Sequence, residues 1–505
     1  MTVMLLRRHA GIDQFISWVH KRQEKQHSCL YFNRKNLYCL SKASRCVILI
    51  LNQSAIFVGN GDIIFDLKMA IEGIMSIWNQ KSKILVTCPK GVPPYLKEEI
   101  KALDFPILME MDTAIQTEGT LQDTMILNLH LRTAQRVLYQ LEKITVSTPE
   151  VLYKKIKSIQ WENLLHDSGR AAYVCVSSIA DNPLITDSRF VNVKVKDAIV
   201  DRMRDKCGRR PDSGPDKDKA VVHVYWKNDQ ADVYLDTSGE RLSLRGYRKI
   251  PLQAPMQETL AAAVIMATGW TGEKNFINPM CGSGTLAIEA AYIALNRAPG
   301  LMRNNYGFMF IKEFPEEFWQ ELRKKTKANA RKILPAKIIA TDIDKAAVTA
   351  ARQNAQTAGV DHLIEFNTCS YENTPLPEDG GIIILNPPYG ERMDAINTKS
   401  RATNFRDSRE SSAPGRKIIL RKSFDRQDKA KDFQMLEATY QGIGDFFKKT
   451  GGGCSGYIFT GNLEMIKKVG LRTKRRIIFY NGEIECRLLE YELYAGSQKH
   501  SETAI

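Results

Sequence analysis

The sequence contains few cysteines and no long apolar run. Its 505 residues include ten scattered cysteines without CxxC pairs, which argues against a disulfide scaffold and against a structural zinc site. Apolar runs such as Cys46 to Leu51 are far too short to span a bilayer. Arg7 and Arg8 stand near the start, but no signal-peptide core follows them. We therefore expect a globular protein of the reducing cytoplasm, with no metal and no membrane partner.

Negative charge is also scarce relative to positive charge. Lys and Arg number 72, Asp and Glu number 57, and the formal net charge is +15. Because basic side chains bind phosphates with release of counterions, we expect a polyanionic partner, with an ordinary basic surface as the alternative. Hydrophobic residues make up 43% of the chain, and this length allows several domains with sizeable cores.

The sequence divides into three regions. Residues 1–80 show no clear periodicity, and we leave them unassigned, either as an N-terminal extension or as an over-long start with Met75 as the true initiator. Residues 81–245 alternate short strands and helices, as α+β modules do. Residues 250–495 alternate strand and helix in the rhythm of a doubly wound α/β domain. Within that domain, the Ser-, Arg-, Lys- and Asp-rich composition of residues 394–430 predicts a mobile insertion, either a nucleic-acid-contacting flap or a segment without a role.

The second region contains a basic helix. We predict a strand at Thr124–Leu129, then helices at Thr133–Leu141, Pro149–Ile159 and Phe190–Cys207. The cations in and just after the last helix are Lys194, Lys196, Arg202, Arg204, Lys206, Arg209 and Arg210. A solvated face would account for one basic helix. The second cluster that follows it makes these seven residues RNA-binding candidates.

The residues after the apolar run Ile382–Leu385 suit chemistry on a planar amino group. The run is typical of a parallel strand buried on both faces, and it is followed by Asn386, Pro387, Pro388 and Tyr389. The Asn386 oxygen and the carbonyl before the second proline can accept hydrogen bonds from an NH2, and the prolines hold these acceptors in place. The Tyr389 ring can stack on a flat base. The alternative is a strand that ends in a rigid turn.

A glycine-rich turn precedes this motif in the chain. The predicted strand Asn275–Pro279 leads into the candidate cofactor-binding residues Asn278, Met280, Cys281, Gly282, Ser283, Gly284 and Thr285. Glycines let a backbone approach a ligand closely, and the helix that follows offers unpaired N–H groups. The same turn also occurs where only the packing of strand and helix requires it.

Two aspartates follow the next predicted strand, Lys337–Thr341. A carboxylate at this position binds the ribose hydroxyls in other doubly wound nucleotide sites, and we assign that role to Asp342. Asp344 precedes the predicted helix Lys345–Ala358 and caps it or assists in binding. The chain lacks the lysine of a phosphate-binding glycine-rich loop, which favours a nucleoside cofactor such as S-adenosylmethionine over ATP.

The end of the chain predicts an antiparallel hairpin. Asn481-Gly482 stands between the strand-like runs Arg476–Tyr480 and Glu485–Leu493. An Asn-Gly pair between two such runs is the strongest short signal for a hairpin.

From about Lys83 to Tyr494 the chain resembles the class I S-adenosylmethionine-dependent RNA methyltransferases that carry an N-terminal THUMP domain. It is particularly similar to the 23S rRNA guanine-N2 methyltransferase group, which is often labelled as N6-adenine-specific DNA methylases. The resemblance rests on Asp236–Gly239, Leu244–Arg248, Ala254–Ala263, Pro279–Thr285, Asn386–Arg392, Phe459–Asn462 and Lys474–Arg476. It implies a Rossmann-like methyltransferase domain, preceded by a ferredoxin-like and THUMP module that grips RNA.

The same resemblance assigns roles to the motifs. Met280–Gly284 would hold the methionine part of the cofactor, Asp342 its ribose and Asn386–Tyr389 the target amine. Many relatives place an Asp after the fourth strand to hold the adenine, and Ser370 stands there in this chain. A hydroxyl still makes one such hydrogen bond, so Ser370 stays a candidate cofactor residue. Some bacterial relatives carry a second fused methyltransferase domain; this chain ends soon after the first, so we expect one activity.

The expected reaction is methyl transfer to the N2 amine of a guanine in 23S rRNA. Direct in-line attack by the amine needs positioning and polarisation rather than a strong base, and the base must leave its stack. An adenine-N6 target in DNA or RNA, or a tRNA guanine, would satisfy the same motif. An alternative of another class is a non-catalytic RNA-binding ribosome-assembly factor, although such a protein would not need both motifs.

Overall fold

The computed structural model describes residues 76–182, 187–250, 256–390, 426–450 and 454–493, together with four strands nearer the N-terminus. The chain separates into two compact units, Met1–Asn79 and Gln80–Ile505, and each is described by itself. The insertion that we predict at 394–430 lies outside the described residues up to residue 425.

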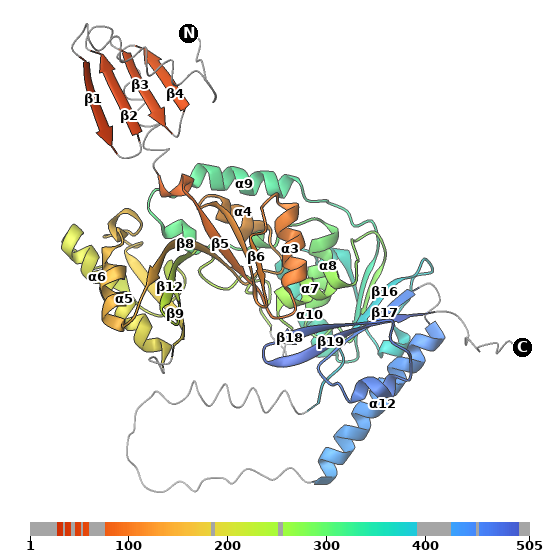
Figure 1. Cartoon of the computed structure of the whole chain (residues 1–505). Helices are drawn as coiled ribbons and strands as arrows, with labels where there is room; N and C mark the ends of the chain where they lie inside the picture. Colours follow the sequence, from red (N-terminus) through yellow and green to blue (C-terminus); the bar gives the residue numbers. More distant parts are fainter. Residues whose placement is uncertain are drawn as a thin grey trace, which may run out of the picture. The chain divides into compact units, whose positions relative to one another are not determined.

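The first unit contains a four-stranded antiparallel meander (Figure 1). Its strands are β1 Ser28–Asn33, β2 Asn36–Ser41, β3 Cys46–Leu51 and β4 Ser54–Gly59. Each strand pairs with the next, beginning with Asn33 opposite Asn36 in the first hairpin. Residues 1–80 are unassigned in the sequence analysis, because these strands are short and their residues do not alternate cleanly between polar and apolar.

The second unit begins with an eight-stranded sheet in the order β10-β9-β11-β12-β8-β5-β7-β6. Its strands are β5 Lys81–Thr87, β6 Met109–Met111, β7 Ala114–Thr120, β8 Arg136–Thr145, β9 Tyr173–Asp181, β10 Asp212–Ser213, β11 Ala220–Lys227 and β12 Gln230–Asp236. The helices of this region are α3 Pro93–Ala102, α4 Asp123–His130, α5 Pro149–Ser158 and α6 Ser188–Cys207. Strand β8 pairs with β5 on one side and β12 on the other, so it joins the two halves of the α+β region into one sheet.

Two predicted elements of this region are wrong. Thr124–Leu129, predicted as a strand, lies in helix α4, and most of Thr133–Leu141, predicted as a helix, lies in strand β8. Asp123 fixes the start of α4, because its carboxylate accepts from the Thr120 N–H at 2.7 Å while the Thr120 hydroxyl accepts from the Asp123 N–H. Pairing on both edges makes the second segment a central strand, a tertiary effect that overrides local helical periodicity.

The methyltransferase-like part contains a seven-stranded sheet in the order β15-β14-β13-β16-β17-β19-β18. Its strands are β13 Phe276–Pro279, β14 Ile338–Asp342, β15 Ile364–Thr368, β16 Gly381–Leu385, β17 Cys454–Thr460, β18 Arg475–Asn481 and β19 Ile484–Glu492. Its helices are α7 Glu258–Ala267, α8 Thr285–Ala294, α9 Glu316–Ala328, α10 Lys345–Ala358 and α12 Arg426–Thr450. The first five strands run parallel, and β19 reverses direction.

These observations confirm the predicted fold class, an α+β module followed by a doubly wound domain. The C-terminal hairpin is also confirmed: β18 and β19 pair as far as Asn481 opposite Ile484, and Gly482 and Glu483 form the turn. Gly482 has a φ of +66°, which glycine adopts at no steric cost. The predicted buried strand at Ile382–Leu385 is β16, and all of its residues are buried.

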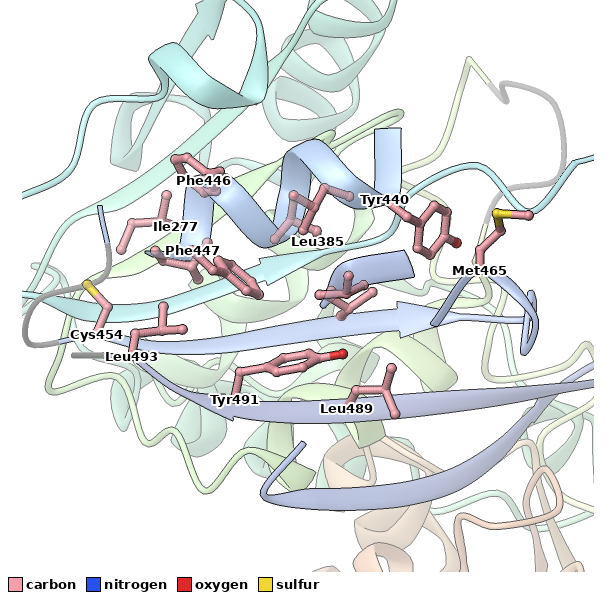
Figure 2. Close-up of a cluster of buried hydrophobic side chains, with 14 residues drawn as sticks. Ile277, Leu385, Tyr440, Phe446, Phe447, Cys454, Met465, Leu489, Tyr491 and Leu493 are labelled. Atoms are coloured by element: carbon pink, nitrogen blue, oxygen red, sulfur yellow. The ribbon is translucent and has the colours of Figure 1, made fainter. Parts of the chain in front are cut away.

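Helix α12 and the central strands share one apolar core (Figure 2). Phe446 and Phe447 of α12 pack with Tyr491 of β19, and the Phe447 and Tyr491 ring centroids lie 5.7 Å apart. Ile277 of β13 and Leu385 of β16 belong to the same cluster. Burial of this many large side chains fixes the ends of β13 and β16 relative to each other.

We also searched the described residues for disulfides, membrane-spanning helices and metal sites. The cysteines among them, Cys88, Cys175, Cys207, Cys281, Cys369, Cys454 and Cys486, are free thiols. No described helix is both long enough and apolar enough to cross a membrane. No three His, Cys, Asp or Glu side chains gather as a metal site would require in the described ranges.

Candidate cofactor and amine site

The candidate residues lie at the carboxyl ends of three adjacent strands. The sheet order places β13 between β14 and β16, and all three run parallel. Asp342 is the last residue of β14, the glycine-rich turn follows β13, and Asn386 follows β16. Ligands bind at this edge in open α/β sheets, so the fold brings three motifs that are far apart in sequence to one place.

The turn after β13 has an unusual backbone. Gly282 and Gly284 have φ values of +54° and +80°, and Met280, which is not a glycine, has a φ of +56°. A non-glycine residue in this region is uncommon and costs on the order of 1 kcal/mol or more. A Cβ at Gly284 would lie 2.9 Å from the Ala351 Cβ of helix α10. The glycine therefore allows the start of α8 to pack closely on α10.

Asp342 ties this turn to the neighbouring strand. Its carboxylate accepts hydrogen bonds from the Gly282 N–H at 2.9 Å and from the Asp344 N–H at 3.0 Å. Asp342 is half-buried, whereas Asp344 is exposed. Asp344 caps helix α10, because its side chain accepts from the Ala346 N–H at 2.8 Å. The two bonds leave further lone pairs on Asp342 for a ligand.

The other turn residues are mostly buried. The Asn278 amide donates to the Ile384 carbonyl at 2.9 Å, so it holds β13 to β16. Its Oδ1 is buried and accepts no hydrogen bond from the described residues. Cys281 is buried, and burial together with the nearby Asp342 raises the pKa of its thiol far above the usual range, which leaves it protonated. The Ser283 hydroxyl lies 3.4 Å from that of Thr285.

Ile343, which the sequence analysis did not single out, lies beside the predicted ribose-binding residue Asp342. Ile343 lies between the two aspartates, and 76% of its surface is exposed. The exposure of this isoleucine could not be read from the sequence. Ser370 follows β15, half-buried, and its hydroxyl lies 3.4 Å from the Glu372 carboxylate. Its contact with adenine stays a prediction.

Tyr389 and Asn386 form the centre of the amine motif. The Tyr389 hydroxyl donates to the Asn386 Oδ1 at 2.7 Å. Burial raises the pKa of Tyr389 well above its usual range, with smaller effects of Cys486 and Tyr440, so the hydroxyl keeps its proton and stays a donor. This bond fixes which way the Asn386 amide points. The oxygen keeps a second lone pair for another donor.

Residues after β17 hold this motif in place. The Asn462 amide donates to the Tyr389 carbonyl at 3.0 Å. A Cβ at Gly461 would lie 2.9 Å from Cδ2 of the Tyr389 ring, so the ring packs closely on the backbone there. The stacking of Tyr389 on a base stays a prediction. The Tyr440 hydroxyl of α12 contacts Thr460 at 2.5 Å and donates weakly to the Pro388 carbonyl at 3.4 Å. Pro387 itself is buried.

Fewer cations of the basic helix α6 are available to bind RNA than its sequence indicates, because several form ion pairs. Arg202 forms a two-pronged ion pair with Glu162, with distances of 2.9 and 2.5 Å. Three more cations lie near acids: Lys196 at 2.6 Å from Asp197, Arg204 at 3.1 Å from Asp201, and Lys194 at 4.0 Å from Glu150. Lys206, Arg209 and Arg210 are exposed and form no ion pair with another described residue. Their contact with RNA stays a prediction.

Family models match three successive parts of the chain. Residues 83–138 match a model described as the RlmL ferredoxin-like domain, residues 146–236 match the THUMP domain, and residues 245–405 match the RMKL-like methyltransferase domain. The order of these matches follows the order of the two sheets described above.

Comparison with whole proteins gives the same result as the family models. A ribosomal RNA large subunit methyltransferase K/L of Syntrophotalea carbinolica is 32% identical over 81% of this chain and 53% of its own length. The chain thus spans about half the length of this relative. A protein of Synechocystis sp. PCC 6803, provisionally named an RNA methyltransferase, is 31% identical over 73% of this chain and 85% of its own length.

A solved structure shares the fold. A provisionally named methyltransferase, solved with S-adenosylhomocysteine, superimposes with a TM-score of 0.65 over 83% of this chain and all of that one, at 24% identity. The architecture, the three matched domains and the extent of the match to the Synechocystis protein lead to one conclusion. The chain belongs to the THUMP-containing family of class I RNA methyltransferases that includes the ribosomal RNA large subunit methyltransferases K/L.

Proposed function

We propose that this protein transfers a methyl group from S-adenosylmethionine to the N2 amine of a guanine in 23S rRNA. The observation that carries the proposal is the adjacency of the two motifs. The turn braced by Asp342 follows β13, and the Asn386 motif follows β16, which is the next strand in the sheet. A donor site and an amine site at one sheet edge are what direct transfer between two substrates requires.

The residues present fit S-adenosylmethionine, which the family membership implies. Asp342 has lone pairs left for the ribose hydroxyls, and the glycines of the turn admit a close ligand. The buried Asn278 Oδ1, which accepts no bond from the described residues, would take a hydrogen bond from the methionine ammonium. Ile343 would cover one face of the adenine. The bound cofactor supplies an activated methyl group on its sulfonium.

The amine motif supplies orientation and polarisation. The Tyr389 hydroxyl occupies one lone pair of the Asn386 oxygen, so the other points in a fixed direction. An exocyclic amine that donates to this oxygen and to a prolyl carbonyl becomes more pyramidal, and its nitrogen becomes a better nucleophile. The amine loses its proton after attack, so the protein needs no strong base. Preorganised acceptors of this kind contribute because they need no rearrangement during the reaction.

The substrate assignment rests on the family and on the RNA-binding module. A relative is named as a large-subunit rRNA methyltransferase, and the THUMP-type region adjoins the methyltransferase domain. The base must leave its stack to reach a pocket at the sheet edge. An rRNA substrate would place the protein in the cytoplasm. The Asn-Pro-Pro-Tyr motif suits two exocyclic amines, guanine N2 and adenine N6. We choose guanine N2 on the basis of the family.

Nucleoside analysis tests the proposal. The purified protein is incubated with methyl-labelled S-adenosylmethionine and, in parallel, with protein-free 23S rRNA, bulk tRNA and duplex DNA, and each product is digested to nucleosides. We expect labelled N2-methylguanosine from 23S rRNA. Labelled N6-methyladenosine, or label in tRNA or DNA alone, would overturn the substrate assignment. If no substrate is labelled and calorimetry detects no cofactor binding, the chain is a non-catalytic RNA binder.

A further inference from the structure

A cleft of about 470 Å³ lies at the junction of the α+β region and the methyltransferase domain. Three segments line it: the start of β8, the loop between β10 and β11, and the connection from β12 into α7. The lining residues are Arg136, Pro215, Lys217, Glu240, Arg241, Ser243, Leu244, Arg248, Gln257 and Glu258. None of them belongs to the cofactor and amine site described above.

The cleft carries more positive than negative charge. Its lining contains four cations and two carboxylates. Arg136 pairs with the buried Asp236, and Arg248 lies 3.4 Å from Glu258. Lys217 and Arg241 form no ion pair with a described residue, and the remaining carboxylate, Glu240, is exposed.

Lys217 lies in an environment that disfavours its own charge. It is half-buried, and burial together with the positive charges of Arg136 and Arg241 lowers the pKa of its ammonium group, while Asp236 and Cys175 act in the opposite direction. An anion bound between Lys217 and Arg241 would relieve this repulsion. The neighbouring Arg248 has a buried Nε without a hydrogen-bond partner among the described residues.

The walls of the cleft are held by hydrogen bonds. The Arg303 guanidinium, which is 8% exposed, donates to the carbonyls of Glu240 and Arg241 at 3.0 Å each. The Gln135 and Gln257 side chains meet across the junction at 3.2 Å. The cations therefore project from a preformed surface, so the protein would lose little conformational entropy when a ligand binds.

One wall also contacts the cofactor turn. Arg248 donates to the Met256 carbonyl at 2.6 Å and to the Thr285 hydroxyl at 3.0 Å. Thr285 is the first residue of α8, directly after the glycine-rich turn. An RNA strand bound in the cleft would therefore lie beside the segment proposed to hold the methyl donor.

We propose that this cleft binds a backbone phosphate of the RNA substrate, with Lys217 and Arg241 as its principal contacts. The inference rests on the proposed function, because it takes RNA as the substrate. It differs from the sequence prediction, which placed RNA contacts on α6 and just after it, where four of the seven cations already lie near acidic side chains. RNA rather than a small phosphate compound is favoured because the cleft is open and lies between the RNA-binding module and the catalytic domain.

The experiment compares two double variants with the wild type. Lys217→Gln/Arg241→Gln removes the two unpaired cations of the cleft, and Lys324→Gln/Lys332→Gln removes two exposed lysines that do not line it. Binding of a short oligouridylate and of a 23S rRNA fragment is measured over a range of salt concentrations. Thermal unfolding of all three proteins checks that the fold is kept.

The cleft variant should lose affinity for both RNAs by about fivefold per cation, and the slope of log K against log salt should fall by about 0.7 per cation. The matched control should bind with a slope nearer that of the wild type. Equal slopes for the wild type and the cleft variant would overturn the proposal. Loss of S-adenosylmethionine binding with RNA binding intact would also overturn it, because the cleft would then serve the cofactor.

Two further measurements distinguish a failure of the cleft proposal from a failure of the proposed function. Inorganic phosphate that binds the wild type but not the cleft variant, with no difference in RNA binding, would show a small-anion site and overturn the RNA assignment. Methyl transfer by the wild type tests the proposed function independently. If the wild type methylates 23S rRNA and the cleft variant binds RNA normally, only the cleft assignment fails. If methylation fails but the RNA slopes differ as expected, only the proposed reaction fails.

Discussion

Arg245 and Glu289 form a two-pronged ion pair that is almost completely buried. The Nε–Oε1 and Nη2–Oε2 distances are 3.1 and 3.3 Å, and the two side chains are 2% and 0% exposed. The Tyr247 hydroxyl donates to the same carboxylate at 3.0 Å, and Arg245 donates to the Arg132 carbonyl of the α+β region. Glu289 lies on α8, the helix that starts at the cofactor turn. The pair thus connects the α+β region to the helix that follows the glycine-rich turn.

Glu289→Gln should destabilise the protein by about 3 kcal/mol or more, because removing one partner leaves a buried guanidinium without a counter-charge. Chemical denaturation measures the change. Replacing both partners with apolar residues, as in Arg245→Met/Glu289→Leu, should cost less than the single change. A single variant as stable as the wild type would show that the buried guanidinium does not need this counter-charge.

Asn386→Ala should abolish methyl transfer and leave S-adenosylmethionine affinity within about twofold, because the amide lies after β16 and the cofactor turn after β13. Single-turnover kinetics and calorimetry measure the two effects. Transfer at the wild-type rate would refute the role of Asn386 in holding the amine.

Tyr389→Phe tests the orientation of that amide separately. The change keeps the ring that packs on Gly461 and removes only the hydroxyl that donates to Asn386. We expect kcat to fall by about tenfold, equivalent to about 1.4 kcal/mol, with little change in KM for either substrate. A change confined to KM would instead assign Tyr389 to substrate binding.

Asp342→Asn should weaken S-adenosylmethionine binding by roughly tenfold to a hundredfold, since hydrogen bonds to a charged group contribute about 1.5–3 kcal/mol. Asp344→Asn is the matched control, because asparagine caps a helix about as well as aspartate and Asp344 serves as the cap of α10. Equal cofactor affinities for the two variants would count against a ribose contact at Asp342.

Gly284→Ala should destabilise the protein more than Gly169→Ala. Both glycines have a positive φ, +80° and +75°, which costs an alanine about 1 kcal/mol. Only at Gly284 would the new methyl lie 2.9 Å from Ala351, whereas nothing lies within 4 Å at Gly169. Unfolding curves and cofactor titrations of the two variants separate backbone strain from the close packing of α8 on α10. Equal losses would show that the contact is relieved without cost.

The order of the elements could be predicted from the sequence wherever a local rule was strong. Asn481-Gly482 predicts a hairpin because a tight turn needs a positive φ, which Gly482 supplies. Ile382–Leu385 predicts a buried parallel strand because a run without polar residues suits an interior. Pro149 and the apolar spacing after it predicted α5. These patterns act over a few residues, so they hold without knowledge of distant partners.

Partners far apart in the sequence decided the rest. Thr133–Leu141 is mostly a strand because β5 and β12 pair with it on both edges, and Arg202 of α6 is neutralised by Glu162, forty residues earlier. The bond between Tyr389 and Asn386 depends on Gly461, which packs against the ring, and on Asn462, which donates to the Tyr389 carbonyl.

The sequence by itself determined the chemical groups at the site and the rhythm of the two domains, because motif chemistry and hydrophobic periodicity are local. Only the tertiary structure decided which charges remain unpaired and which surfaces face one another. Lys217 and Arg241 stand out only once folding has paired Arg136 with Asp236 and Arg248 with Glu258. Pairing of charges depends on distances in space, and the sheets and helices set those distances.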